Sequence, residues 1–480
     1  MVLPPVDHEC SLLGFVTELA NRLAKLEHEN AQLKKAMFGK RSERTKLPPP
    51  GPREPKTAAE ALATRRERAE TKAQTPTLRV DHKVPEALRQ CPACARRDLA
   101  PMGPGKSTFV WEFVPAKFVR HEHVQEVLRC RCGGGVVTAP GAPKIVEKGQ
   151  YGASFLAHLA VAKCADHIPI YRIEKELARK GVPVARSTMN DLLHRASAIL
   201  APLSARLLDV IRMRAIVLAD ETRLRMMRGA EGKPKTGFVW TFGAADAAGG
   251  FDVAYHFAES RSGATPKGLL EGTTGVLLVD GYSGYNAVEA VSSRRRAACF
   301  AHVRRYFFES LKTAPVAQEA LDLIAEIYRL EREARDGGLS ETSHLDFRKR
   351  RAGPIHEALR TWLDIQAPRH PPKSPLGMAI RYTLGQWKEL GVFLDDSRVP
   401  LDNNASERAL RRIALGRKNY LFVGDVAAGQ SLAGLYSLVA TCELRGINPF
   451  DYLVDVLARV QDHPASALDD LLPGAWAATG

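Results

Sequence analysis

The spacing of apolar positions near the start of the chain predicts a coiled coil. Leucine recurs every seven residues, and a second apolar series with one asparagine in it lies between the leucines. The two series are Leu12, Leu19, Leu26 and Leu33, and Val16, Leu23, Asn30 and Met37. Such a repeat over residues 1–45 is typical of a parallel coiled coil, in which a polar residue in the apolar seam selects the register. The alternative is an amphipathic helix that packs within its own chain.

The apolar pattern then changes twice before the first long helical segment. Residues 46–78 are rich in proline and basic side chains and have no apolar period, which indicates a flexible linker. Residues 79–140 form a short segment that carries cysteines, and residues 141–205 have the apolar period of helices. The chain is therefore expected to contain several domains.

Within the helical segment, residues 171–197 match the pattern of a helix-turn-helix unit. Gly181 is expected to end the first helix, and Ser187 is expected to cap the second. In such a unit the first residues of the second helix enter the major groove of DNA. The residues predicted to contact DNA are Arg186, Ser187, Thr188 and Asn190. The alternative is an ordinary helical hairpin without a DNA contact.

Short, continuous apolar runs after residue 206 predict buried strands, and with the helices they predict a mixed α/β fold. Two of the runs, AIVLAD and GVLLVD, end in Asp220 and Asp280. Runs of this kind are typical of central strands that are buried on both faces. If the two strands are neighbours, their carboxylates lie close together, which costs free energy unless a cation neutralises them. The alternatives are a turn at Asp280 and a turn or helix cap at Asp220.

The stretch LDNNASERALRR combines acids, amides and arginines at the start of a predicted helix. Asn404 followed by Glu407 is the pattern of a capping box, in which the asparagine caps the helix and the glutamate bonds back to the cap. A capping box does not account for the basic residues that follow, which are Arg408, Arg411, Arg412, Arg417 and Lys418. Carboxylates that hold a metal, beside basic groups that hold phosphates, would account for both.

The net charge of the chain narrows the class of partner. It is +15 at pH 7 over 480 residues, and this excess predicts a polyanionic partner, with nucleic acid as the first candidate. A membrane is the weaker candidate, because no uninterrupted run of about 18 apolar residues occurs. The start of the chain lacks the basic residues and cleavage site of a signal peptide, so we expect a cytoplasmic protein without a membrane partner.

The cysteine spacing predicts a structural zinc site. Four of the eight cysteines form two close pairs, CPAC and CRC, which can close a tetrahedral thiolate shell: Cys91, Cys94, Cys130 and Cys132. Only one residue separates the second pair, so His121 and His123 are alternative ligands, and buried cysteines without a metal are the other alternative. The scattered cysteines are predicted to be small core residues: Cys10, Cys164, Cys299 and Cys442.

Four segments resemble the signature blocks of the insertion-sequence-66 (IS66) family of bacterial transposases. They are ADET, VDGYSGY, CFAHVRRYFFE and LDNNASERALRRIALGRKNYLFVGD, and the resemblance extends in order over nearly the whole chain. It implies a ribonuclease-H-like core with an Asp-Asp-Glu (DDE) triad of Asp220, Asp280 and Glu407. Departures from the family pattern are Arg412 in place of proline, Asp425 in place of serine, and the CRC spacing.

The resemblance completes the predicted domain organisation. It implies a coiled coil, a zinc-ribbon-like module and a helix-turn-helix region before the core. The core would occupy residues 206–312 and 401–440, interrupted by a helical insertion over 313–400 and followed by a helical region over 441–480.

The resemblance also implies a chemistry and its partners. The triad would hold two Mg²⁺ or Mn²⁺ ions about 3.5–4 Å apart for DNA strand cleavage and strand transfer, without a covalent protein–DNA intermediate. The implied partners are the terminal inverted repeats of a mobile element, target DNA, further copies of the chain in at least a dimer, and accessory proteins of the same element. The protein would associate with the nucleoid.

Further residues of the matched blocks are candidates for DNA contacts. Phosphate contacts are predicted for Arg304, Arg305, Arg408, Arg411, Arg417 and Lys418. His302 belongs to the same block as Arg304, and its alternative is a core histidine beside solvated arginines. Trp362 and Trp387 in the insertion are either base-stacking residues or, as we expect, core residues.

Three other functions remain open at this level. The first is a dimeric, zinc-containing DNA-binding regulator without catalysis, which would have no need of two strand-terminal aspartates and a Glu/Arg helix. The second is a metal-dependent nuclease of ribonuclease-H type, which does not account for the N-terminal modules. The third is an inactive member of the family, against which the intact triad argues.

Overall fold

The sheet and the helices around it belong to the second of two compact units, Met1–Glu112 and Phe113–Gly480. The structure, a computed structural model, describes residues 118–119, 121–129, 136–138, 145–146, 149–228 and 233–476. The predicted coiled coil over 1–45, the linker over 46–78 and the four predicted zinc ligands lie outside these residues, as does Cys10.

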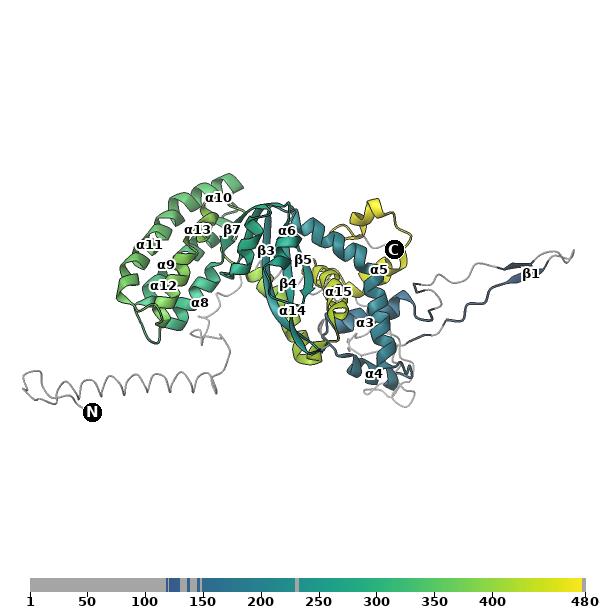
Figure 1. Cartoon of the computed structure of the whole chain (residues 1–480). Coiled ribbons are helices and arrows are strands. Elements are labelled where there is room, and N and C mark those ends of the chain that lie inside the picture. The colour runs from purple at the N-terminus through teal and green to yellow at the C-terminus, as the bar shows by residue number, and fades with distance from the viewer. Residues whose placement is uncertain are drawn as a thin grey trace, which may run out of the picture. The chain divides into compact units, whose positions relative to one another are not determined.

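A mixed sheet with strand order β5-β4-β3-β6-β7 forms the centre of the described unit (Figure 1). Strands β3 to β5 pair in antiparallel fashion, whereas β6 and β7 run parallel to β3. Their bounds are β3 (Ile216–Met226), β4 (Lys235–Ala245), β5 (Phe251–Ala258), β6 (Thr274–Val279) and β7 (Ser293–Ala298). Both predicted strands are observed, and they are neighbours, which is the condition under which their aspartates lie close together. The predicted end of the first strand at Asp220 is wrong, because β3 continues to Met226 with β4 as its partner.

Two short pairings complete the strands of the described residues. Strand β8 (Phe422–Val423) pairs with the far end of β3, at Arg225 and Met226. Strands β1 (Val127–Arg129) and β2 (Val136–Thr138) form a separate antiparallel pair.

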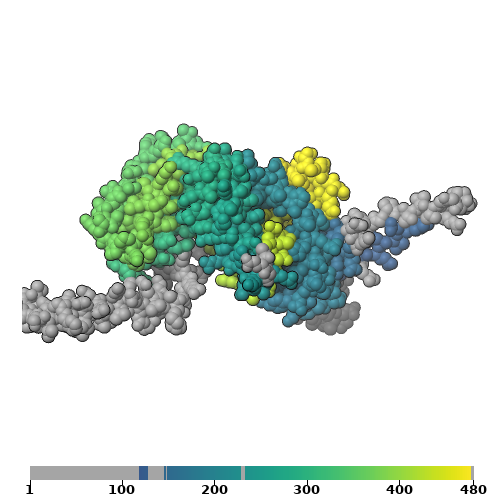
Figure 2. All heavy atoms as spheres, viewed as in Figure 1, coloured from purple at the N-terminus to yellow at the C-terminus, as the bar shows by residue number. Residues whose placement is uncertain are grey.

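Two apolar clusters pack around the sheet, because successive side chains of a strand point to opposite faces and both faces are covered. The larger cluster joins Val217, Ala219, Leu224 and Met226 of β3 to helices α3 (Ala153–Cys164), α4 (Ile170–Arg179), α5 (Arg186–Arg212), α15 (Val426–Leu444) and α16 (Pro449–Arg459). The smaller cluster joins Leu218 to α8 (Phe300–Ser310), α9 (Ala317–Asp336), α11 (Gly353–Gln366) and α12 (Pro375–Gly385). In Figure 2 the green insertion and the blue helices lie on opposite sides of the teal sheet.

Shorter elements connect these layers. They are α6 (Ala264–Leu270), η2 (Ser283–Tyr285), α7 (Asn286–Glu289), α10 (Glu341–Phe347), the π-helical turn η3 (Arg348–Ala352), η4 (Ala367–Arg369), α13 (Trp387–Leu390), η5 (Val392–Leu394) and η6 (Ala465–Leu471). The predicted helical character of 313–400 is thus observed. Among the described helices, none combines the length and apolar character that crossing a membrane requires.

The predicted helix-turn-helix segment contains two helices, α4 and α5, joined by a tight turn. Gly181 adopts a φ of +78°, a conformation that glycine reaches without strain, and the N–H of Val182 closes the end of α4 on the carbonyl of Leu177 at 2.9 Å. The predicted cap of α5 is wrong. The cap is Ala185, whose carbonyl already accepts the N–H of Met189, so the helix begins before Ser187 can cap it. Helix α5 then continues without a break past residue 205, the predicted end of this region.

The tryptophans and the described cysteines occupy the expected core positions. Trp362 is 9% exposed, and its indole N–H donates to a carboxylate oxygen of Glu319 at 2.7 Å. Trp387 is half-buried and stacks on His356, with ring centroids 4.1 Å apart. The buried free cysteines are Cys164, Cys299 and Cys442.

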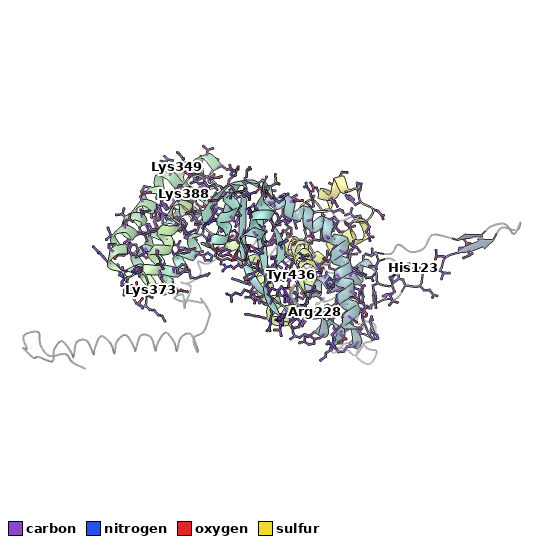
Figure 3. All side chains as sticks on the ribbon, viewed as in Figure 1. His123, Arg228, Lys349, Lys373, Lys388 and Tyr436 are labelled. Atoms are coloured by element: carbon purple, nitrogen blue, oxygen red, sulfur yellow. The ribbon has the colours of Figure 1, made fainter. Side chains whose placement is uncertain are left out.

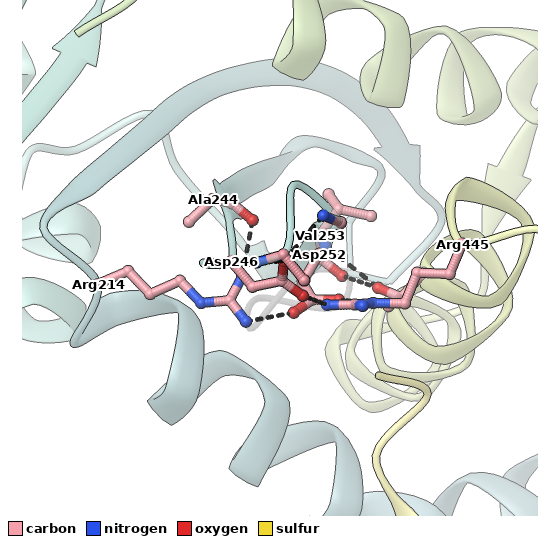
Figure 4. A network of polar contacts seen from close by, with 9 residues as sticks. Arg214, Ala244, Asp246, Asp252, Val253 and Arg445 are labelled. Carbon is pink, nitrogen blue, oxygen red and sulfur yellow. Dashed lines mark hydrogen bonds and ion pairs between the residues drawn. The ribbon is translucent and has the colours of Figure 1, made fainter. Parts of the chain in front are cut away.

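A buried ion-pair network ties the β4–β5 hairpin to α15 and α5 (Figure 4). The carboxylate of Asp252, which is 3% exposed, accepts from the guanidinium groups of Arg445 and Arg214. Arg445 also donates to Asp246 at 2.6 Å, and Arg214 to the carbonyl of Ala244 at 2.8 Å. Two arginines that follow the ends of distant helices thus neutralise one buried acid.

Replacing Arg445 with alanine is expected to lower the free energy of unfolding by about 2–3 kcal/mol, because one buried carboxylate loses a charged donor. Urea unfolding followed by circular dichroism measures the change. The control is Arg329→Ala, since Arg329 forms only exposed ion pairs with Glu326 and Glu333 and its loss should change the midpoint much less. Equal losses for the two variants would show that the buried network stabilises the fold no more than an exposed ion pair does.

Candidate active site

Asp220 and Asp280 lie at the same level of two neighbouring parallel strands, Asp220 within β3 and Asp280 directly after the end of β6. Leu218 of β3 lies opposite Leu278 of β6, and each aspartate follows two residues later. Because side chains two residues apart share a face, Asp220 lies on the same face of the sheet as Leu218, toward α8. The sheet therefore brings the two carboxylates to one edge and one face.

Asp280 also makes the turn that the sequence offered as its alternative role. Its carboxylate accepts the N–H of Tyr282 at 2.9 Å, directly after β6 ends. Gly281 then passes so close to the ring of Tyr382 that an added Cβ would lie 2.5 Å from it, and its N–H donates to that hydroxyl at 3.1 Å. The turn and the site are thus two roles of one residue, and the turn holds the carboxylate in place.

Glu407 reaches the site because helix α14 (Asn404–Tyr420) lies along a free stretch of β3. Strand β6 ends at Val279 while β3 continues, so backbone groups of β3 lack a strand partner there. Side chains of the α14 segment replace that partner: the amide of Asn403 donates to the carbonyl of Ala219 at 2.7 Å, and Arg417 donates to the carbonyl of Arg223 at 2.6 Å. The first turn of α14 is thereby held beside Asp220.

The predicted capping box at the start of α14 is wrong. The cap is Asn403, and its side chain does not cap the helix because its amide is bonded to the neighbouring strand. The N–H of Asn404 is satisfied instead by Asp402, at 3.1 Å. The Oε1 atom of Glu407 is buried and has no hydrogen-bond partner. The glutamate side chain is therefore available to a ligand.

The electrostatics of Asp220 show that the three acids act on one another. Burial raises the pKa of Asp220 to about 8, and the negative charges of Glu221, Asp280 and Glu407 add to this effect. A hydrogen bond from the N–H of Glu221, at 2.8 Å, opposes it only in part. Without a cation, Asp220 is therefore mostly protonated at neutral pH, and a cation would favour its ionised form.

Basic groups of α8 face the third acid. Nδ1 of His302 lies 3.7 Å from Oε1 of Glu407, and a guanidinium nitrogen of Arg305 lies 3.9 Å from Oε2. Both separations exceed hydrogen-bond length, so the two groups attract the Glu407 carboxylate electrostatically without a hydrogen bond between them. Arg304, which directly precedes Arg305 in the same helix, is exposed. Of the CFAHVRR block, the structure therefore brings His302 and Arg305 to the triad.

A fourth carboxylate near the site was not assigned from the sequence. The side chain of Glu221 is 1% exposed and belongs to the opposite face of β3. It accepts from the hydroxyl of Tyr285 at 2.6 Å and from Nε of Arg261 at 2.7 Å. Arg261 balances the charge of Glu221, and Tyr285 satisfies its other oxygen with a hydrogen bond. Its position directly after Asp220 in the ADET motif was the available signal, but only the fold shows that it is paired.

Most of the predicted DNA-contacting residues lie at least partly on the surface, whereas Arg417 is bonded within the fold. Exposed on the described surface are Arg186, Ser187, Asn190, Arg304, Arg408, Arg411 and Lys418, whereas Thr188 and Arg305 are half-buried. Arg417 is bonded to β3, and Arg412, which the sequence grouped with them, forms an ion pair with Glu443. His121 and His123, the alternative zinc ligands, are exposed, with ring centroids 6.1 Å apart.

The donor set of the triad fits hard divalent cations. Mg²⁺ prefers oxygen ligands, and the site offers three carboxylates, one with an unpartnered buried oxygen and one whose ionised form needs a neighbouring positive charge. The fold and the site thus define a class: a mixed α/β protein with a cluster of three carboxylates on one face of its sheet.

Comparison with known families identifies the particular group. The model described as "Transposase IS66 family" matches residues 148–431, "IS66 C-terminal element" matches 437–473, and "zinc-finger binding domain of transposase IS66" matches 89–133. The chain belongs to the IS66 family of transposases. The zinc-finger match spans the four cysteines of the predicted zinc site and supports a bound Zn²⁺.

Relatives from Sinorhizobium fredii are similar over most of the chain. The protein y4jD is 34% identical over 420 residues, which cover 83% of this chain and 80% of y4jD. The protein y4hP is 30% identical over 419 residues, which cover 82% of this chain and 74% of y4hP. Both are described as uncharacterized proteins.

Proposed function

We propose that this protein is a DDE-type DNA transposase that binds the ends of its own mobile element and catalyses DNA strand cleavage and strand transfer. The observation that carries the proposal is the meeting of Asp220, Asp280 and Glu407 from β3, β6 and α14 in a member of the IS66 family. The mixed sheet with helices on both faces supports a ribonuclease-H-like core with a helical insertion.

In this proposal the three carboxylates hold Mg²⁺ or Mn²⁺. When bound, the metal would stabilise the charge of the phosphoryl-transfer transition state and increase the nucleophilicity of a bound water or DNA 3′-hydroxyl. The chain's own contribution is position and charge. The turn at Asp280 and the contacts of α14 with β3 hold the acids, while Arg305, 3.9 Å from Glu407, adds positive charge beside them.

Exposed basic side chains on several elements support binding of double-stranded DNA. Arg408 and Arg411 project from α14, and exposed lysines lie on the insertion: Lys349, Lys373 and Lys388 (Figure 3). At the other end, the first residues of α5 are exposed and remain the predicted groove contacts. Because α5 runs unbroken to the sheet, DNA held at Arg186 would have a defined position relative to the triad.

The test is an assay of the full-length protein on labelled DNA carrying the inverted repeats that bracket its gene, with Mg²⁺ or Mn²⁺ and with the accessory proteins of the element. We expect nicking at the repeat ends and joining to target DNA by a homo-oligomer, at least a dimer. End binding without cleavage would favour the regulator function. Cleavage without joining would favour a nuclease. Full activity in all of Asp220→Asn, Asp280→Asn and Glu407→Gln would show that the triad assignment is wrong.

A further inference from the structure

Three side chains of different chemistry converge beside the triad. The Sγ of Cys299, a ring nitrogen of His302 and a carboxylate oxygen of Glu407 all lie within 4.8 Å of one another. Cys299 is the cap of α8 and His302 lies one turn into that helix, so the two share one side of its first turn. Glu407 comes from the first turn of α14, far along the chain. We call these three residues the thiol–imidazole–carboxylate cluster.

The cluster has unsatisfied polar atoms. Nδ1 of His302 and Oε1 of Glu407 are both buried, and neither has a hydrogen-bond partner. Buried polar atoms of this kind are uncommon, because each costs free energy unless a partner or an ion satisfies it. Two such atoms 3.7 Å apart, pointing toward one space, are well placed to share a cation.

The sulfur is held in position for the same space. The Cys299 side chain is 1% exposed, and its Sγ accepts the N–H of Asn403 at 3.2 Å. The side-chain amide of Asn403 also ties α14 to β3, so one residue positions both the sulfur and the turn that carries Glu407. The neighbouring residues Phe300 and Val303 are fully buried, which keeps the first turn of α8 rigid.

The donor atoms of the thiol–imidazole–carboxylate cluster favour a different metal from the one that the three carboxylates of the triad favour. Thiolate and imidazole ligands favour Zn²⁺, whereas Mg²⁺ prefers oxygen ligands alone. Zinc sites that exchange ligands use three protein donors and leave a fourth position open, which is the number of donors available here.

We propose that Cys299, His302 and Glu407 form a zinc site that shares Glu407 with the triad, so that Zn²⁺ inhibits the Mg²⁺-dependent reaction. On binding, the S–H bond of Cys299 breaks, an S–Zn bond forms, and the proton passes to solvent. Glu407 would then be a zinc ligand and would no longer coordinate Mg²⁺ together with Asp220 and Asp280. The site itself stands on the geometry of the described residues, while its inhibitory consequence rests on the proposed function.

The first experiment measures zinc binding without reference to activity. Zinc bound per full-length chain is determined by elemental analysis and titration calorimetry. The wild type should bind one more Zn²⁺ than Cys299→Ala or His302→Gln, with affinity at this site reduced more than about 100-fold in each variant. The zinc module should remain loaded in all of them. The control is Cys442→Ala, which removes another fully buried thiol far from the cluster and should leave zinc binding unchanged.

Equal zinc content in the wild type and the cluster variants would overturn the proposal. Should Cys299→Ala fail to fold, Cys299→Ser retains an acceptor for the N–H of Asn403 and still weakens zinc binding. The second experiment titrates Zn²⁺ into the strand-cleavage assay at fixed Mg²⁺. Each variant is compared with its own zinc-free rate, and Cys299→Ser should need at least about 10-fold more zinc for half inhibition than the wild type does.

The two measurements separate the possible failures. A wild type that binds the extra zinc but cleaves no DNA contradicts the proposed function and leaves the zinc site standing. An active wild type with no extra zinc, and with the same zinc inhibition as Cys299→Ser, contradicts the zinc site and leaves the proposed function standing.

Discussion

Replacing Asp220 with asparagine is expected to reduce Mg²⁺-dependent strand cleavage and strand transfer by about 10³-fold or more. The substitution keeps the size of the side chain but removes the charge that a divalent cation requires, and a catalytic metal contributes several kcal/mol to the transition state. Asp220 is half-buried, and burial together with the neighbouring acids raises its pKa to about 8. Single-turnover rates on repeat-end DNA measure the effect.

The same variant should be more stable than the wild type when no divalent cation is present. Between pH about 4, where an unfolded aspartate titrates, and pH about 8, the folded wild type holds a proton that the unfolded chain has lost. The stability of the wild type therefore falls as the pH rises through this window. Asparagine does not titrate, so at pH 8 Asp220→Asn should gain roughly 2–4 kcal/mol over the wild type, and near pH 4 the two should be equal.

Mg²⁺ should reverse this order, because it binds the folded wild type and stabilises it by mass action. The control is Asp425→Asn. Asp425 is exposed and caps α15 by accepting the N–H of Ala428 at 2.8 Å, a role that asparagine retains. It should change neither the rate nor the pH dependence. A slow Asp220→Asn variant with no gain in stability at pH 8 would indicate that the carboxylates do not repel one another in the folded protein.

Replacing Arg348 with alanine is expected to lower the free energy of unfolding of the insertion by about 3–5 kcal/mol. Arg348 is 2% exposed and donates to both carboxylate oxygens of Glu331, at 2.9 and 2.8 Å, as well as to the carbonyls of Phe393 and Asp396. Burial alone would raise the pKa of Glu331, but the bonds and charge of Arg348, with those of His344, hold it below its ordinary value. Removal of the arginine leaves this acid buried without its main donor.

Urea unfolding again measures the loss, and Arg350→Ala is the matched control. Arg350 lies in the same turn, is largely exposed, and pairs only with Asp346 at 3.4 Å, so its replacement should cost less than about 1 kcal/mol. A double variant, Arg348→Met with Glu331→Leu, should lose less than Arg348→Ala, because no charge is then left buried. A double variant that is no more stable than Arg348→Ala would show that packing, and not charge burial, determines the loss.

Local patterns predicted the elements of this fold better than their caps. The two apolar strands that carry the aspartates and the helix after Asn403 were predictable, because continuous apolar runs and helical periods depend on neighbouring residues. The end of the first strand was not, since β3 continues past Asp220 to Met226. Both predicted caps were wrong. Asn403 caps α14, while its side-chain amide donates to the carbonyl of Ala219 in β3. Ala185 caps α5, so the helix begins before Ser187. Such competition for hydrogen bonds is not visible in a local pattern.

The basic residues show the same limit. The sequence placed five basic residues around Glu407 without distinguishing them. In the structure Arg412 pairs with Glu443 and Arg417 supports β3, which leaves Arg408, Arg411 and Lys418 exposed for a phosphate. Only tertiary contacts separate an arginine that holds the fold from one that can hold DNA.

The sequence by itself determined the candidate acids, the order of strands and helices around them and the resemblance to one family, because these depend on residue type and order. The tertiary structure decided what those residues form together. The pairing of β3 with β6 sets Asp220 level with Asp280, and the free edge of β3 draws α14, and with it Glu407, to the same place. It also brought Cys299 and His302 to that glutamate, because packing joins residues that are far apart along the chain.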